Sequence, residues 1–309
     1  MDAGSNATVT SILVARLMKV IVNPVAGHGR SPRFLSELKS CLQARGLKWD
    51  FFETNRPGHA RELAEEMVRQ GSNRLVVMGG DGTISEVMNG ILGSDLELGV
   101  ISVGTGNDVA RSLGLPVNKP EKALDIILNG RVLLMDVGCE GNRHFLSLLG
   151  VGFPVIVAEE ANRMKHLKGP PAFFIAVYKA LYKMRATAVH LQLDGRRLDV
   201  KCTSIMVQNT PYTGGGLLMA PDARMDDGLL DVVIVEDIGK FDLMVNFPKV
   251  YKGTHFSHPS FSVYRARNIK IESEEKLPKM VDGDAAGNLP AFITVREKAL
   301  KVIVGHSAE

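Results

Sequence analysis

The sequence RLVVMGGDGT, at residues 74–83, joins an apolar run to a glycine-rich turn. Residues 74–78 predict a buried β-strand, and the apolar spacing from about 84 to 92 predicts a helix after the turn. The pattern repeats at 98–113, where an apolar run is followed by GTGND and a short helix. Strands that end in such turns and lead into helices are typical of α/β proteins, so these stretches decide the fold of the first half.

The rest of the first half shows the same alternation. Apolar runs predict strands at 18–22 and 49–53, and helical spacing predicts helices at 33–45 and 58–70. Strands that alternate with helices predict a mostly parallel, doubly wound sheet. Ligands of such sheets bind beyond the carboxyl ends of the strands. Three polar or glycine-rich loops are expected at those ends.

The pattern changes near residues 132–137, where we expect a domain boundary. Short β-rich runs follow, interrupted by helix-like segments at 155–186 and 239–251. Most of this half therefore predicts an antiparallel β-sandwich. The runs are 143–149, 187–193, 200–208, 229–235, 262–272 and 291–304.

The composition excludes several classes of protein. With 45% hydrophobic and 23% charged residues, the 309-residue chain is neither disordered nor fibrous. A net charge of +3 does not predict a nucleic-acid partner. Cys41, Cys139 and Cys202 lack metal or disulfide spacing, which favours a reducing cytosol. No apolar run reaches the roughly 18 residues of a membrane span. We interpret residues 1–17 as a leader or a disordered segment, with Met18 a candidate natural start.

The loops after the predicted strands carry the chemistry. Glycines in GGDGT, at 79–83, allow close backbone approach and aim N–H groups at an anion such as a polyphosphate. A carboxylate repels phosphate, so Asp81 indicates a nearby magnesium ion or a hydroxyl group that loses a proton. The alternative is a tight strand-to-helix turn with Asp81 as its cap. The motifs of Walker-type NTPases and of dinucleotide oxidoreductases are absent.

Several long motifs together resemble one family. NPVAGHGR at 23–30, GGDGTISEVMNGI at 79–91 and GTGNDVARSLGLP at 104–116 are similar to the diacylglycerol kinase catalytic domain family, which includes bacterial lipid kinases and sphingosine kinases. The resemblance continues in the second half and preserves the order of the motifs from Met18 onward. The later motifs are NTPYTGGGLLMAPDARMDDGLLDVV at 209–233, KGTHFSHP at 252–259 and VDGD at 281–284.

The resemblance implies an α/β N-terminal domain similar to phosphofructokinase and NAD kinase, followed by a C-terminal β-sandwich domain. We expect the first domain at 18–132, joined by a returning C-terminal strand at about 294–309. The second, β-rich domain is expected at 133–293 and would hold the lipid substrate.

The resemblance also implies ATP and Mg²⁺ as cofactors, and it assigns site residues. Contacts with the nucleotide are implied for Asn23, Pro24, Val25, Ala26, Gly27, Thr54, Gly79, Gly80, Asp81, Gly82, Thr83, Ile84, Ser85 and Thr105. A structural Mg²⁺ site is implied at the DDGLLDV segment. Its ligands would be the Asp227 side chain and the backbone carbonyls of Arg224 and Leu229.

One departure from the family concerns the general base. The resemblance implies a glutamate in a DGE motif, whereas this chain has Asp282-Gly283-Asp284. A base must reach its proton within about 3 Å, directly or through one water, and aspartate is one methylene shorter. We expect Asp284 to be the catalytic base. Two alternatives stay open, namely Asp81 as the base and an inactive enzyme.

The implied reaction is transfer of the γ-phosphate of ATP to a lipid hydroxyl, which depends mainly on positioning and charge neutralisation. Arg30 is a candidate to neutralise phosphate, or a solvated side chain. We expect a cytoplasmic enzyme, from its cysteines, that is peripheral at the inner membrane face, and the resemblance raises a homodimer as an expectation. A soluble NAD kinase-like enzyme and a non-catalytic nucleotide- or lipid-binding relative are the alternatives. The sequence does not identify the lipid.

Residues 161–186 are a candidate membrane contact. They contain six Lys or Arg residues and no acidic residue, so the rest of the chain holds 31 basic against 34 acidic residues. Their apolar side chains, which alternate with basic ones, resemble a helix that lies on anionic lipid. A helix that packs on the domain with a solvated basic face is the alternative. The apolar residues are Phe173, Phe174, Val177, Tyr178, Leu181 and Met184.

Overall fold

The structure, a computed structural model, describes residues 17–163 and 170–306. The expected leader lies outside the described residues, apart from Leu17. The described residues form two compact units: unit 1 runs to residue 134 and resumes at residue 299, and unit 2 lies between them in the sequence. Among the described residues, no helix has the length and apolar character needed to span a membrane.

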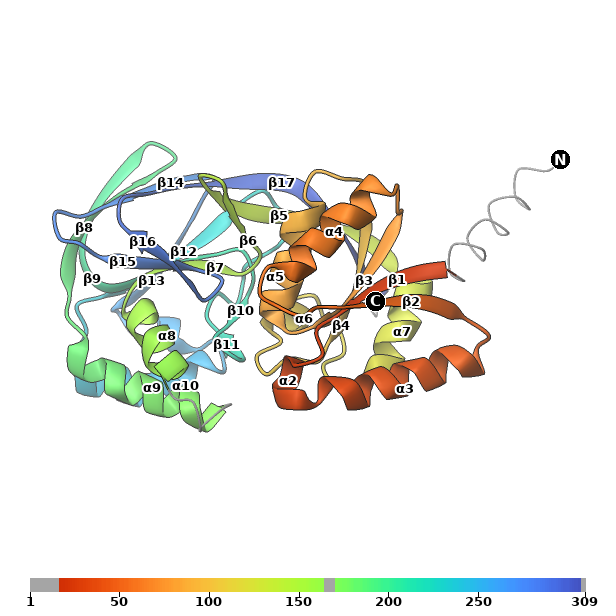
Figure 1. The fold of residues 1–309 in the computed structure, drawn as a ribbon. Coiled ribbons are helices and arrows are strands. Elements are labelled where there is room, and N and C mark those ends of the chain that lie inside the picture. Colours follow the sequence, from red (N-terminus) through yellow and green to blue (C-terminus); the bar gives the residue numbers. More distant parts are fainter. Residues whose placement is uncertain (1–16, 164–169, 307–309) are drawn as a thin grey trace. The chain divides into compact units, whose positions relative to one another are not determined.

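Unit 1 contains the predicted parallel sheet (Figure 1). Its strand order is β4-β3-β1-β2, and Lys301 and Val302 of β17 extend the sheet beside β4. The four strands end at the same edge because all of them are parallel. Their bounds are β1 (Leu17–Val22), β2 (Lys48–Glu53), β3 (Arg74–Gly79), β4 (Glu97–Ser102) and β17 (Ala291–Val304).

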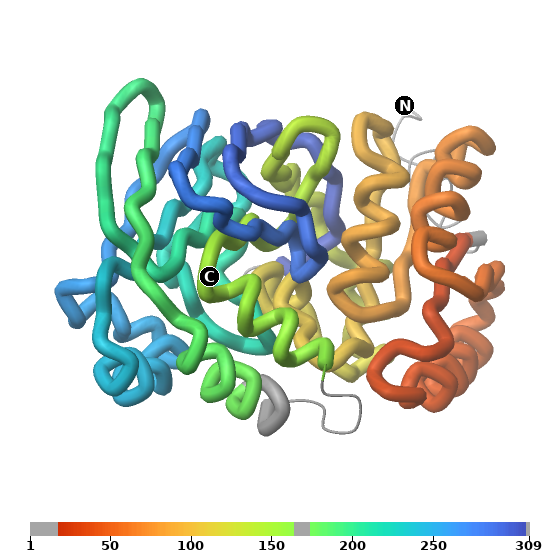
Figure 2. Tube along the Cα trace, turned by 60° about the vertical axis from the view of Figure 1, so that its left-hand side comes forward, coloured from red at the N-terminus to blue at the C-terminus, as the bar shows by residue number. Residues whose placement is uncertain are grey.

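Helices cover both faces of this sheet, as a doubly wound fold requires. Val76 and Met78 of β3 pack in one cluster with buried residues of α3 (Ser31–Ala44) and α7 (Pro120–Asn129). On the other face α4 (His59–Arg69) and α5 (Asp81–Ile91) run side by side, as Figures 1 and 2 show. Gly90 permits this close packing, since a Cβ there would lie 2.6 Å from the Arg61 carbonyl oxygen. The short helices are α2 (Ala26–Gly29) and α6 (Asp108–Ser112).

Unit 2 is built from antiparallel strand pairs, as predicted. The long strand β9 (Arg196–Gln208) pairs with β8, β7 and β12 and organises the unit. The other strands are β5 (Arg131–Glu140), β6 (Arg143–Phe145), β7 (Leu148–Gly152), β8 (Thr187–Leu193), β10 (Tyr212–Thr213), β11 (Leu217–Leu218), β12 (Leu230–Glu236), β13 (Phe261–Ala266), β14 (Asn268–Glu272), β15 (Pro278–Val281) and β16 (Asp284–Asn288).

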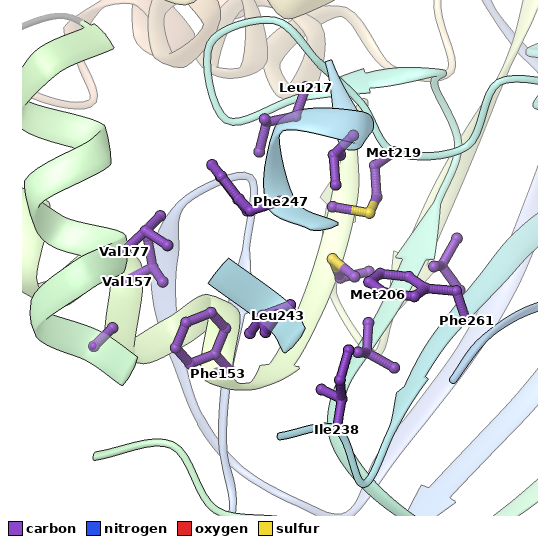
Figure 3. Close-up of a cluster of buried hydrophobic side chains, with 14 of the residues drawn as sticks. Phe153, Val157, Val177, Met206, Leu217, Met219, Ile238, Leu243, Phe247 and Phe261 are labelled. Atoms are coloured by element: carbon purple, nitrogen blue, oxygen red, sulfur yellow. The ribbon is translucent and has the colours of Figure 1, made fainter. Parts of the chain in front are cut away.

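Two apolar cores lie on opposite faces of the central strands. Val207, Val232 and Ile234 belong to the core between the strands. Met206, Val233 and Val235 belong to the second core, which they share with the helices of the unit (Figure 3). These helices are α8 (Phe153–Arg163), α9 (Pro170–Lys183) and α10 (Lys240–Val250), with the short 3₁₀ helix η1 (His255–Ser257).

The structure corrects several predicted elements. The single helix-like segment expected at 155–186 is two helices, α8 and α9. The runs at 143–149 and 262–272 are each two strands, because the chain turns between β6 and β7 and between β13 and β14. Helix α7, strand β5 and the hairpin of β15 and β16 were not predicted.

Candidate functional site

The GGDGT turn is more helical than its sequence predicts. Strand β3 ends at Gly79 and α5 begins at Asp81, so Asp81, Gly82 and Thr83 form the first helical turn rather than a loop before it. The expected start near Ile84 was therefore too late. The first N–H groups of this helix and the positive end of its dipole suit an anion.

Asp81 does not cap its own helix. Its Oδ1 accepts a hydrogen bond from the backbone N–H of Val109, at 3.1 Å, and its carboxylate also interacts with the backbone N–H groups of Asn107 and Asp108. Burial raises the pKa of Asp81 and outweighs these N–H groups, which lower it. Asp81 thus binds the GGDGT turn to the start of α6, in the GTGND stretch.

Asn23 links the ends of β1 and β3. Its Nδ2 donates a hydrogen bond to Thr83 Oγ1 at 2.9 Å, and its Oδ1 accepts one from the Val25 N–H at 3.1 Å. Its own N–H donates to the carbonyl oxygen of Met78 in β3, at 3.0 Å. At the end of β2 the Thr54 N–H donates to the carbonyl oxygen of Val22, at 2.8 Å.

The third loop, at 26–30, meets the GTGND stretch. Arg30 Nε donates to the carbonyl oxygen of Gly27 at 2.8 Å, and its Nη2 donates to that of Gly104 at 3.4 Å. His28 Nδ1 lies 3.0 Å from Thr105 Oγ1. Arg30 therefore helps to build the site, whatever else it binds, and His28 joins a site to which the sequence did not assign it.

Gly27, Gly79 and Gly104 are required by close contacts within the protein. A Cβ at Gly27, whose φ is +60°, would lie 2.2 Å from the Val103 carbonyl oxygen, and one at Gly104 would lie 2.6 Å from the Gly80 Cα. Gly82 differs, since no atom lies within 4 Å of its Cβ position and the residue is exposed. Its lack of a side chain leaves the first turn of α5 open to a ligand.

The structure thus brings most predicted nucleotide residues to the carboxyl edge of the unit 1 sheet. Asn23, Thr54, Gly79 to Thr83 and Thr105 follow four parallel strands that end together. Val25 is exposed at this edge, whereas Ala26 and Ile84 are buried. Asn107 of the GTGND stretch shapes the last loop, since its Oδ1 accepts a hydrogen bond from Ser102 Oγ at 2.6 Å and its Nδ2 donates to the Gly104 carbonyl oxygen at 3.0 Å.

The expected metal residues form a turn in unit 2. Asp227 Oδ1 accepts the N–H of Leu229 at 3.1 Å, and the Arg224 side chain pairs with Asp226 at 3.4 Å. Asp136, which the sequence did not predict, is fully buried and accepts the Gly228 N–H at 2.7 Å. Burial and, less strongly, the nearby Asp227 carboxylate raise the pKa of Asp136.

The donor set of this turn fits Mg²⁺ in kind, because carboxylate and carbonyl oxygens are the ligands that Mg²⁺ prefers. The part of the chain that the structure describes holds no cluster of three or more His, Cys, Asp or Glu side chains around a common point. A cation here would therefore depend on backbone carbonyls, and the metal assignment stays a prediction.

The DGD motif is a tight hairpin. Val281 pairs with Asp284, so Asp282 and Gly283 form a two-residue turn, with φ values of +45° and +92°. Such φ values define the turn that Asp-Gly favours. The Asp282 carboxylate accepts the N–H groups of residues 146, 147 and 148 at 2.9, 2.9 and 3.0 Å. Asp284 is exposed at the first position of β16.

Unit 2 also contains a cavity of about 180 Å³ beside its helices. Its walls are largely apolar and include Phe153, Ile156 and Val189. The basic residues Lys183, Arg185 and Lys276 also line it. A cavity of this composition suits an amphiphile with an apolar chain and an anionic or polar head.

Comparisons with known proteins agree with these features. The sequence profile of the "Diacylglycerol kinase catalytic domain" matches residues 17–139, and that of the "YegS C-terminal NAD kinase beta sandwich-like domain" matches residues 147–304. A diacylglycerol kinase of Mycobacterium tuberculosis (strain ATCC 25618 / H37Rv) is 33% identical over 289 residues, covering 92% of this chain and 93% of the relative. A diacylglycerol kinase of Staphylococcus carnosus (strain TM300) is 30% identical and covers 90% of this chain and 92% of the relative.

The fold agrees as well. The crystal structure of a diacylglycerol kinase from Bacillus anthracis str. Sterne aligns with a TM-score of 0.75 at 24% identity, over 95% of this chain and 98% of that chain. The predicted combination of an α/β domain and a β-sandwich is confirmed.

Proposed function

Because the chain belongs to the diacylglycerol kinase family and is a lipid kinase, we propose that it transfers the γ-phosphate of ATP to the hydroxyl group of diacylglycerol or a related lipid. The proposal includes dependence on Mg²⁺ and action in the cytoplasm on lipid at a membrane surface. The acceptor is a lipid alcohol, which distinguishes this proposal from an NAD kinase-like activity.

ATP binding is supported mainly by one observation, that the first turn of α5 is open. Gly82 leaves space above the N–H groups of this turn, and Asn23, Thr83 and Thr105 surround it with polar groups at one sheet edge. Phosphate oxygens are suitable acceptors for these N–H groups. We assign to the Asp81 carboxylate the Mg²⁺ that would offset phosphate charge during transfer. The Asp227 turn is assigned a separate, structural Mg²⁺.

For the acceptor side we assign Asp284 as general base. Asp284 is exposed and therefore accessible to a lipid hydroxyl, whereas Asp81 is bound to the backbone of α6. A carboxylate that is held against the backbone by N–H groups cannot turn toward a lipid hydroxyl without breaking those bonds, which favours Asp284 over Asp81 for this role.

Incubation of the full chain with γ-labelled ATP, Mg²⁺ and a total lipid extract tests the proposal. We expect label in the organic phase and none when EDTA removes the metal. Asp81→Asn removes the charge assigned to Mg²⁺ and should lower turnover about 100-fold. The protein should stay folded, because asparagine keeps an oxygen acceptor for the Val109 N–H.

Other outcomes would contradict the proposal in different ways. Label in NADP, with NAD as added acceptor, would indicate an NAD kinase-like enzyme, and the absence of any labelled product would indicate a non-catalytic relative. A panel of diacylglycerol, a sphingoid base, phosphatidylglycerol and a polyprenol would then identify the lipid.

A further inference from the structure

Helix α9 has one buried and one exposed apolar face. Val177, Leu181 and Met184 belong to the core shared with the sheet, and Figure 3 shows Val177 pointing into this cluster. Tyr178 and Tyr182 lie on the opposite side with exposed fractions of 69% and 87%. Val177, Leu181 and Met184 are therefore core residues and not part of a membrane contact, and the side chain of Phe173 lies outside the described residues.

Helix α10 extends the exposed face. Its buried residues Leu243 and Phe247 join the same core, whereas Phe241 and Val245 are 70% and 55% exposed. Lys240 connects the two helices, since its Nζ donates to the Tyr182 carbonyl oxygen at 3.0 Å and lies 5.6 Å from the centre of the Tyr182 ring.

The exposed apolar residues form a spaced stripe on each helix. Residues four apart lie on one helix face, so Phe174, Tyr178 and Tyr182 align on α9, as Phe241 and Val245 do on α10. Phe174 joins the helices at one end, because its ring stacks on Tyr251 with centres 5.8 Å apart. We call this surface the α9/α10 face. It consists of Phe174, Ile175, Tyr178, Tyr182, Phe241, Met244 and Val245.

The charges around the α9/α10 face are mainly positive. The exposed basic residues of the two helices and the turn after α10 are Lys179, Lys183, Lys240, Lys249 and Lys252. Lys183 is paired with Glu160 at 2.7 Å, and Asp242 is the exposed acidic residue of α10. A surface that combines aromatic side chains with lysines complements the headgroup region of an anionic bilayer.

We propose that the α9/α10 face docks the enzyme on anionic lipid bilayers. The inference rests on the proposed function, because a kinase that takes its acceptor from a membrane must bind that membrane. It differs from the sequence-based expectation for residues 161–186, since α10 supplies about half of the surface. The tyrosines would lie at headgroup depth with the lysines near lipid phosphates.

Co-sedimentation of the full chain with vesicles tests the docking surface. Vesicles of phosphatidylcholine with phosphatidylglycerol should bind the chain, and salt should weaken the binding because part of it is electrostatic. The double variants Tyr178→Ser/Tyr182→Ser and Phe241→Ser/Val245→Ser should each bind about tenfold more weakly, because each loses exposed apolar area. Lys179→Glu/Lys249→Glu should lose binding mainly on the anionic vesicles.

Phe292→Ser is a matched control outside the α9/α10 face. Phe292 of β17 is 58% exposed and has Lys270 Nζ 5.5 Å from its ring centre, much as Tyr182 has Lys240. It should bind vesicles like the wild type. Circular dichroism and thermal unfolding check that all variants remain folded.

The outcomes separate docking from catalysis, since binding needs no turnover. Wild-type binding by both aromatic double variants would overturn the proposal. A second result would also overturn it: the wild type is a dimer, and the aromatic double variants become monomers whose vesicle binding is unchanged. The α9/α10 face would then bind a second copy of the chain and not a membrane. If the surface is correct, the variants phosphorylate short-chain lipid in solution at the wild-type rate but lose activity on vesicles. If no lipid is phosphorylated by any variant or by the wild type, the proposed function fails while the binding result stands.

Discussion

Two hairpins of unit 2 contain the same Asp-Gly turn in different surroundings. Asp194 and Gly195 join β8 to β9 with φ values of +46° and +89°, and Asp282 and Gly283 join β15 to β16 with +45° and +92°. In both turns the aspartate carboxylate accepts backbone N–H groups from a neighbouring segment. Asp194 binds those of residues 267 and 268 at 3.0 and 2.8 Å.

The difference lies in what each turn holds. The donors that Asp194 binds are exposed, whereas residues 146, 147 and 148, which Asp282 binds, are buried. Arg196 follows the first turn and Asp284 follows the second. The backbone conformation of the DGD motif is therefore that of an ordinary two-residue β-hairpin turn. Two features distinguish this motif. Its first aspartate, the anchor of the turn, binds N–H groups of buried residues, and a carboxylate, that of Asp284, follows the turn.

The largest expected effect comes from the residue after each turn. Asp284→Asn should lower kcat by about 10²- to 10⁴-fold, the usual contribution of a general base, and should leave thermal unfolding unchanged because the side chain is exposed. Arg196→Gln, at the equivalent position of the other hairpin, should leave kcat unchanged. Asp284→Glu, which restores the glutamate of the family motif, should retain activity within about tenfold. Wild-type turnover by Asp284→Asn would remove it as base.

The next largest effect is expected for the two aspartates that bind backbone N–H groups, Asp282 and Asp194. Asp282→Ala leaves buried N–H groups unpaired and should lower the free energy of unfolding by about 3 kcal/mol, while Asp194→Ala should cost about 1 kcal/mol because water reaches its donors. Only Asp282→Ala should also lower kcat, since Asp284 would lose its fixed position. Denaturant unfolding and steady-state kinetics measure both quantities. Equal stability losses, or a kcat loss in Asp194→Ala, would contradict the comparison.

Much of the fold could be predicted because its signals are local. Strands β3 and β4 are continuous apolar runs, as buried parallel strands are. Helix α7 was missed although Pro120 in its first turn and the spacing of Ala123, Leu124 and Ile127 are helical signals. Strand β16 could not be read from its residues, DAAGN, which lack apolar alternation.

The candidate site was predicted only in part, for a physical reason. Gly79 to Thr83 lie within one contiguous motif, so their shared location follows from the sequence. Asp136 and His28 act through contacts with segments distant in sequence, at Gly228 and Thr105, which only the folded chain brings together. Asn107, with φ at +59°, holds its loop through side-chain bonds that spacing does not reveal.

A smaller effect is expected for the turn glycines. Gly283→Ala and Gly195→Ala place a Cβ in open space, since no atom lies within 4 Å of either position, so the cost comes from the left-handed backbone alone. We expect each to lower the free energy of unfolding by about 1 kcal/mol, equal within error, because the φ values are nearly equal. A much larger cost at Gly283 would show that the deeper anchor also restricts its turn.

The smallest expected effect is the pH dependence of the stabilisation that Asp194 contributes. Hydrogen bonds from the N–H groups of Arg267 and Asn268 hold the pKa of Asp194 below its usual range. A lowered pKa in the folded state means that this stabilisation is complete above the unfolded value of about 3.9 and is lost as pH falls through the folded value. The difference in free energy of unfolding between wild type and Asp194→Ala should therefore be constant from pH 7 to 5 and shrink below pH 4. An undiminished difference at pH 2 would mean that Asp194 stabilises its turn without its negative charge. The two hairpins would then not share stabilisation by an ionised carboxylate.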